Sequence, residues 1–234
     1  IGISSHVSLA IYEDFATLAL HEGFPVFELS VGNFGCNNPL WPRTCTQAER
    51  ARISQLLAPF SVLVLRATSE DLNIANINPG QRAEAVRQYL ECIDFALDIG
   101  AHVVSFRPGT QVWGFIAPPE TVMERDTDFA AQAAAYLSGR NLTVAFRTVA
   151  IAPDEMTILL ESADNGAFGG ALDIDVIATA DERTVSIHQM MESIRQWIGA
   201  LRGRTAVVYL SGVHQRWHPV RLAGCPFAMN NCVD

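Results

Sequence analysis

The feature that most restricts the fold of this chain is a repeated alternation of short β-branched runs with longer stretches of helical periodicity. Such alternation is typical of βα units that build a parallel sheet. The expected strands are 2–5, 26–30, 61–66, 102–107, 142–147, 170–175 and 206–210. The expected helices are 12–22, 46–57, 79–99, 120–138, 155–165 and 184–201. Units of roughly 30 residues match barrel geometry better than an open sheet.

The end of the chain does not continue this rhythm. Residues 211–234 are rich in Gly, Pro, Asn and Cys, and they contain neither a clear helix nor an eighth strand. We therefore expect one α/β domain over residues 1–234, a (β/α)8-type TIM barrel that is incomplete or irregularly closed after the seventh strand. The exposed edges then need cover, either from residues 211–234 or from a second subunit, and we expect a homodimer.

Three of the expected strands end in arginine, namely VLVLR at Arg66, VVSFR at Arg107 and VAFR at Arg147. In parallel α/β proteins, ligands bind at the carboxyl ends of the strands. The guanidinium group is permanently charged, and its planar fork of donors matches carboxylate and phosphate. The pattern predicts a pocket for a small anionic substrate, whereas ion pairs with Glu28, Asp173 or Asp175 inside the barrel are the structural alternative.

Composition excludes several classes of function. All 16 basic residues are Arg, so Schiff-base chemistry on Lys and a P-loop Lys are both excluded. The net charge of −9 argues against nucleic acid as a partner. No apolar run reaches the roughly 18 residues of a membrane span, and the start of the chain lacks a signal-peptide pattern. The five Cys residues include no CxxC motif, and we expect thiols in a cytoplasmic protein. A disulfide within Cys36/Cys45 or Cys225/Cys232 is the alternative, since both pairs lie in loop-like sequence.

Several segments resemble the xylose-isomerase-like TIM barrel family, which includes sugar isomerases and epimerases, dehydratases and the endonuclease IV group. They are IGISSH, HEGFPVFEL, the stretch DLNIANINPGQRAEAVRQYLECIDFALDIGAHVV, and GALDIDV. The resemblance covers roughly residues 1–224, and its most specific part surrounds Asn73, Arg82 and Gly100. It implies a TIM barrel fold with a site at the carboxyl ends of the strands.

The resemblance also implies one to three divalent metal ions held by Glu, Asp and His, but this chain departs from that ligand pattern. Arg66 and Arg107 occupy strand positions that often carry His, and Arg147 stands at the position of a metal-binding Glu. Asp173 is retained, whereas Tyr209 replaces a later His. Each guanidinium would repel a cation by about 3–4 kcal/mol per unit charge at 4–6 Å. We therefore expect no metal and no other cofactor.

The remaining site candidates are acids, hydroxyls and aromatic side chains near the predicted barrel mouth. Proton-transfer candidates are His6, Glu28, Asp173, Tyr209 and His214, since each can exchange a proton. Packing, ion pairing or a satisfied hydroxyl would be their structural roles. In the loop RPGTQVWGF, Trp113 and Phe115 follow Arg107 and would contact an apolar part of the substrate or stack on a sugar face.

Three functions remain open on these residues. The first is a metal-independent isomerase, epimerase, dehydratase or cyclase, of the isomerase or lyase class, acting by proton transfer on a carboxylate or phosphate substrate. The second is a metal-dependent sugar isomerase or epimerase with rearranged ligands such as Glu28, Asp173, Asp175 and His214. The third is a non-catalytic binding or interaction protein, because one fold hosts many chemistries. The sequence does not identify the substrate.

Overall fold

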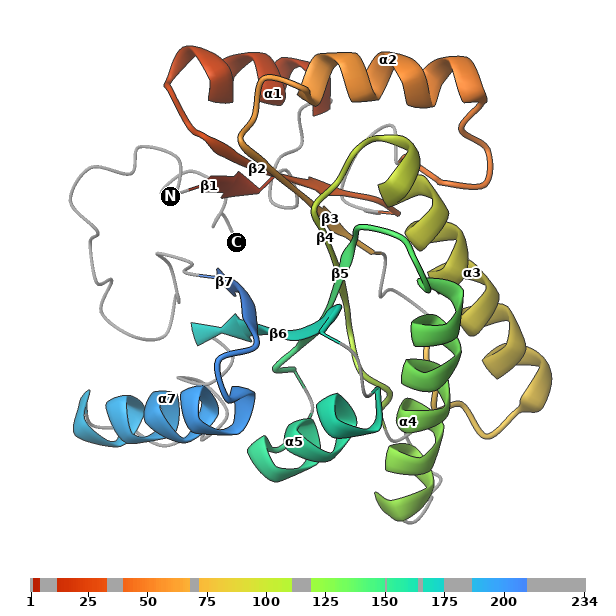
Figure 1. Cartoon of the computed structure of the whole chain (residues 1–234), viewed down its shortest axis with the longest axis vertical. Helices are drawn as coiled ribbons and strands as arrows, with labels where there is room; N and C mark the ends of the chain where they lie inside the picture. Colours follow the sequence, from red (N-terminus) through yellow and green to blue (C-terminus); the bar gives the residue numbers. More distant parts are fainter. Residues whose placement is uncertain are drawn as a thin grey trace, which may run out of the picture.

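The strands of this protein form one parallel sheet in which every strand pairs with its neighbours in the sequence. The computed structural model describes residues 2–4, 12–32, 40–67, 72–110, 119–149, 151–163, 166–174 and 187–209. Seven strands run in the order β1-β2-β3-β4-β5-β6-β7, and all adjacent pairs are parallel. The sheet curls, and the helices lie on its outer side (Figure 1). This is the winding of a TIM barrel, as the sequence predicts.

The elements lie close to their expected positions. The strands are β1 Gly2–Ser4, β2 Val26–Ser30, β3 Val62–Arg66, β4 Val103–Phe106, β5 Thr143–Arg147, β6 Phe168–Asp173 and β7 Thr205–Tyr209. The helices are α1 Tyr12–His21, α2 Gln47–Leu57, α3 Pro79–Asp98, α4 Pro119–Tyr136, α5 Pro153–Ser162 and α7 Ile187–Leu201. None of the described helices is long and apolar enough to cross a membrane.

The strand β6 begins and ends two residues earlier than the expected 170–175. The expected strand began at Gly170 and left out Phe168 and Gly169. A Cβ on Gly170 would lie 2.1 Å from Leu201 Cδ2, and one on Gly169 would lie 2.5 Å from the Arg204 carbonyl oxygen. These glycines therefore belong to a strand that the end of α7 and the following turn approach closely.

The two faces of the sheet have different roles because side chains alternate along each strand. Phe27, Leu29, Leu63 and Leu65 point outward into the main core beneath the helices. Farther round, Tyr89, Phe106, Phe129, Phe146 and Phe168 form a chain of ring contacts with centroids 4.7–6.2 Å apart. The opposite parity faces the interior of the curled sheet, and the polar residues of β2 to β7 lie there.

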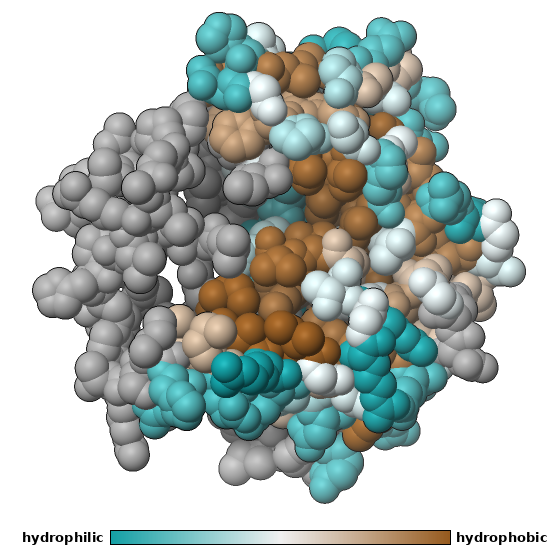
Figure 2. Space-filling view, turned by 60° about the vertical axis from the view of Figure 1, so that its left-hand side comes forward, coloured by the Kyte–Doolittle hydropathy of each residue, from teal (hydrophilic) through white to brown (hydrophobic). Residues whose placement is uncertain are grey.

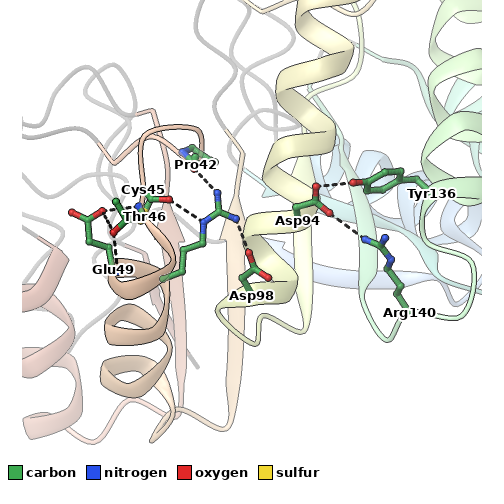
Figure 3. A network of polar contacts seen from close by, with 9 residues as sticks. Pro42, Cys45, Thr46, Glu49, Asp94, Asp98, Tyr136 and Arg140 are labelled. Atoms are coloured by element: carbon green, nitrogen blue, oxygen red, sulfur yellow. Dashed lines mark hydrogen bonds and ion pairs between the residues drawn. The ribbon is translucent and has the colours of Figure 1, made fainter.

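Polar contacts join neighbouring helices on the outside. Asp98, near the end of α3, accepts a hydrogen bond of 2.6 Å from Arg50 of α2, whose guanidinium also donates to the carbonyls of Pro42 and Cys45. On the same helix, Asp94 accepts from Tyr136 and Arg140 next to α4 (Figure 3). Two carboxylates of α3 thus join it to the helices on both sides.

The sheet is open between its first and last strands within the described residues. There β1 pairs only with β2, and β7 pairs only with β6. Val208 of β7 is 49 % exposed, and apolar residues of α5 and α7 such as Ile158 and Ile198 are also exposed. Figure 2 shows an apolar surface bordered by polar residues on the side turned toward the viewer. An exposed strand edge of this kind needs a partner.

We expect residues 211–234 or a second copy of the chain to cover this edge. Deleting residues 211–234 should then lower the melting temperature, if that segment covers β7, or light scattering of the full chain should give the mass of a dimer. A full-length monomer whose melting temperature is unchanged by the deletion would contradict both forms of the expectation.

Candidate active site

The interior of the curled sheet has an apolar floor. Val64, Val103, Ala145 and Ala171 come from four consecutive strands and form a small buried cluster. Each of them lies two residues before a polar residue of the same parity, and those residues are Arg66, Ser105, Arg147 and Asp173. Strand alternation therefore places a polar layer directly above the floor, toward the carboxyl ends of the strands.

Glu28 is the centre of a hydrogen-bond chain that crosses this layer. It is only 4 % exposed, and its carboxylate accepts hydrogen bonds from the Ser4 and Tyr209 hydroxyls. The Tyr209 and Ser105 oxygens are 3.0 Å apart. Burial, followed by the Glu28 charge, raises the pKa of Tyr209. The phenol is therefore protonated at neutral pH and donates to Glu28, so Ser105 must donate to Tyr209.

Asp173 and Arg147 form a buried ion pair on adjacent strands. Arg147 Nη2 lies 2.6 Å from Asp173 Oδ2, and both residues are less than 10 % exposed. The Asp173 amide also donates to Thr148 Oγ1 at 2.9 Å. The ion pair given as the structural alternative for the arginines is therefore present at Arg147, whose charge neutralises that of Asp173. Its Nε is buried and has no hydrogen-bond partner among the described residues, so the guanidinium is only partly used.

Arg66 on β3 and Arg147 on β5 both lie over the ring of Tyr209 on β7. The Arg66 and Arg147 guanidinium carbons lie 6.0 and 5.4 Å from the centroid of the Tyr209 ring. Burial and then the charge of Arg147 lower the pKa of Arg66 below its ordinary value. No salt bridge joins Arg66 to a described acid. The repulsion between two guanidiniums on one ring favours an anion that both can contact.

Arg107 follows β4 directly and has the same parity as Ser105. The Tyr89 hydroxyl donates to the Arg107 carbonyl oxygen at 3.4 Å, which attaches the backbone to α3. Arg107 Nε is buried and lacks a hydrogen-bond partner among the described residues. An unsatisfied buried donor costs about 1–3 kcal/mol, and a bound acceptor would remove that cost.

The structure thus brings together five of the predicted site residues within the polar layer. Glu28 and Tyr209 are in contact, Arg147 and Asp173 are paired, and Arg66 lies over the same ring. His6, Trp113, Phe115 and His214 lie outside the described residues, as does Asp175. Ser4 and Ser105 were not predicted as site residues, although Ser105 is a lone hydroxyl of inward parity in an apolar strand, which is a usable signal.

The described residues do not fit a divalent metal ion. They contain no group of three or more His, Cys, Asp or Glu side chains that could hold one. The layer contains two buried acids. Asp173 is paired with Arg147, and Glu28 accepts hydrogen bonds from two hydroxyl groups. Hard cations need several converging oxygen or imidazole donors, and guanidinium groups oppose them.

A cavity of about 210 Å³ lies elsewhere, between the segment before α2 and the outer face of α3. Trp41, Arg87 and Cys92 are among its lining residues, and no residue of the polar layer lines it. The polar layer inside the sheet is therefore separate from this outer cavity.

Comparison with known proteins gives a likeness of fold. No family model and no curated protein sequence matches the chain. Among solved structures, a D-tagatose 3-epimerase-like protein matches with a TM-score of 0.68 and 15 % identity, over 88 % of this chain and 73 % of that one. The structure of an L-ribulose 3-epimerase matches with a TM-score of 0.66 and 19 % identity, over 89 % and 68 %.

A third match is the xylose isomerase domain protein from Planctomyces limnophilus, with a TM-score of 0.56 and 13 % identity over 82 % of this chain and 67 % of that one. At these identities the comparisons establish architecture. The predicted resemblance is confirmed at that level: the described part of this chain has the fold of the xylose-isomerase-like TIM barrels.

Proposed function

We propose that this protein is a metal-independent enzyme of the isomerase or lyase class that acts by proton transfer on a small anionic substrate. The observation that carries the proposal is the placement of Arg66 and Arg147 over the ring of Tyr209, which itself hydrogen bonds to buried Glu28. Positive charge that can bind an anion therefore lies beside a carboxylate that can accept a proton. The 3-epimerase folds among the matched structures support a sugar-type substrate, such as a sugar acid or sugar phosphate.

Glu28 is the better of the two buried acids as a proton acceptor. It accepts hydrogen bonds from the neutral hydroxyl groups of Ser4 and Tyr209, whereas Asp173 is bound by a guanidinium. In the proposed reaction the carboxylate of Glu28 takes a proton from a carbon next to a carbonyl group. The electron pair of that C–H bond then moves to the carbonyl oxygen as an enolate.

The arginines supply the electrostatic part of this chemistry. Fixed positive charge in a site with low water content stabilises a developing enolate or carboxylate without reorganisation during the reaction. Arg66 and Arg107, which form no salt bridge with a described acid, are the groups available to a substrate; Arg147 is shared with Asp173. Return of the proton to the opposite face of the same carbon gives epimerisation. Its delivery to the former carbonyl carbon, with a proton moving between the two oxygens, gives isomerisation. Loss of a β-hydroxyl group, which takes up a proton and leaves as water, gives dehydration. An apolar part of the substrate would contact Trp113 and Phe115, if these line the mouth as the sequence predicts.

A non-catalytic anion-binding protein on the same scaffold is the second candidate, favoured by the ion pair that neutralises Asp173. A homodimer located in the cytoplasm is part of the first proposal and rests on the sequence and on the open edge of the sheet.

The proposal predicts that purified protein contains no stoichiometric divalent metal and exchanges substrate carbon-bound hydrogen with solvent in the presence of EDTA. A panel of sugar acids and sugar phosphates would be incubated in D2O, with deuterium incorporation followed by NMR and metal content by elemental analysis. About one Mn, Mg, Co or Zn ion per chain together with exchange that EDTA abolishes would overturn metal independence. Ligand-induced thermal stabilisation without any exchange would support the binding protein instead.

A further inference from the structure

A buried carboxylate outside the polar layer makes a contact that the candidate site does not explain. Asp126 lies on α4 and is only 1 % exposed. Its Oδ1 atom accepts a hydrogen bond of 2.8 Å from the backbone amide of Gly109. Gly109 belongs to the connection between β4 and α4, at the carboxyl ends of the strands. A buried acid is costly, so its retention at this position calls for a function or a structural contact that offsets the cost.

The approach of Asp126 to this connection depends on the absence of a side chain at Gly109. A Cβ atom there would lie 2.4 Å from Asp126 Oδ1 and 2.4 Å from Ala75 Cβ. Both distances are far below van der Waals contact, and the neighbouring groups are buried. Gly109 is thus clamped between α4 and the connection that follows β3.

Asn73 binds the same connection from the side of β3. Its Nδ2 donates to the Thr110 carbonyl at 2.7 Å, and its Oδ1 accepts from the Thr110 amide at 3.1 Å and from the Ala75 amide at 2.9 Å. The Arg125 guanidinium donates to the Ala75 carbonyl at 2.7 Å. Backbone groups of two adjacent connections are therefore held together by side chains of α4 and by Asn73.

This arrangement restricts the backbone that carries Arg107. Gly109 is two residues beyond Arg107, and the residue between them is Pro108, whose φ angle is restricted. The Arg107 carbonyl is itself held by Tyr89. We propose that Asp126, acting through Gly109, is a positioning residue that sets where the Arg107 guanidinium lies at the strand ends. The role in ligand binding rests on the proposed anion site, whereas the effect on the position of Arg107 does not.

The charge on Asp126 changes near neutral pH. Burial raises the pKa of Asp126 to about 7; the Gly109 amide opposes this shift, the Glu155 charge on α5 adds to it, and the Arg82 charge on α3 opposes it. Deprotonation strengthens the hydrogen bond from Gly109, because a charged acceptor binds a donor more strongly than a neutral one. The clamp on Gly109 should therefore tighten as the pH rises through about 7.

The test is NMR of the full chain, comparing Asp126→Ala and Asp126→Asn with Asp128→Asn. Asp128 lies on the same helix, is exposed and pairs with Arg82, so its variant is the matched control. In Asp126→Ala we expect exchange of the Gly109 amide to accelerate at least tenfold and the Arg107 Nε–Hε resonance to shift. Asp126→Asn keeps a hydrogen-bond acceptor for the Gly109 amide, so the Arg107 Nε–Hε resonance should stay at its wild-type position. The change of that resonance with pH near 7 should be lost, because Asn does not titrate. The control should resemble the wild type in all three measurements.

Two results would overturn the positioning role. One is an Arg107 resonance that is unchanged in Asp126→Ala while Gly109 exchange accelerates, since the contact would then be purely local. The other is unchanged exchange of Gly109 in that variant. If Asp126→Ala does not fold, Asp126→Asn tests the positioning role instead. An Arg107 resonance that still changes with pH in that variant as it does in the wild type would show that Asp126 does not cause the change, and would overturn the role.

Titration with inorganic phosphate separates this proposal from the proposed function. If both hold, Asp126→Ala and Arg107→Ala each weaken phosphate binding, and the double variant binds no more weakly than Arg107→Ala alone, because both act through one group. Additive losses would overturn the coupling. If the wild type binds neither phosphate nor a sugar acid, the anion site is wrong, and the positioning role is still decided by the Gly109 and Arg107 resonances.

Discussion

Replacing Arg147 by alanine is expected to lower the free energy of unfolding by about 3–5 kcal/mol, because it leaves the buried carboxylate of Asp173 without its counter-charge. The two side chains are 2.6 Å apart and only 9 % and 10 % exposed, so solvent cannot replace the lost partner. The measurement is chemical denaturation at neutral pH. Arg202→Ala is the control, since it breaks an ion pair with Glu161 whose side chains are 66 % and 55 % exposed. That change should cost at most about 1 kcal/mol.

The double variant Arg147→Leu with Asp173→Leu refines this expectation. Two apolar residues bury no charge, so much of the lost stability should return. If Arg147→Ala alone lowers the free energy of unfolding by less than about 1 kcal/mol, Asp173 is not held by Arg147 in solution. A double variant less stable than Arg147→Ala would instead point to a defect of packing.

Replacing Arg66 by alanine is expected to weaken anion binding by about ten- to hundredfold while leaving the melting temperature nearly unchanged. A charge-assisted hydrogen bond contributes about 1.5–3 kcal/mol. No salt bridge joins Arg66 to a described acid, and burial and the charge of Arg147 both lower its pKa. Its removal therefore breaks no ion pair and loses only the contact with the Tyr209 ring and the longer-range attraction of Glu28 and Asp173. Affinity would be measured by calorimetric titration with inorganic phosphate and gluconate.

Arg66→Lys and Arg52→Ala complete this experiment. Lysine should recover little affinity where two guanidinium donors contact the anion, because an ammonium group cannot reproduce the fork. Arg52 pairs with Glu13 on the outer helices and its loss should leave affinity unchanged. A large fall in melting temperature with intact affinity would mean that Arg66 is architectural, contrary to the proposed site.

Strand periodicity determined much of the candidate site. Alternation within VLVLR, VVSFR and VAFR places Arg66, Arg107 and Arg147 on one face, and the parallel order places them at one end. The bounds of β2 and the start of α3 at Pro79 follow equally from local patterns. These features depend on residues close together in the sequence, so a local pattern is enough to predict them.

The tertiary structure alone decided how these groups are paired. The sequence left Arg147 open between a ligand and an ion pair; only the register of β5 against β6 brings it to Asp173, 26 residues away. Likewise, Tyr209 reaches Glu28 across 181 residues, and Asp126 reaches Gly109 from a neighbouring helix. Gly169 of β6 was missed as well, because the close approach of the Arg204 carbonyl that excludes a side chain there is a contact between elements. Contacts of this kind arise from packing, and the sequence on its own determines only which face and which end each residue occupies.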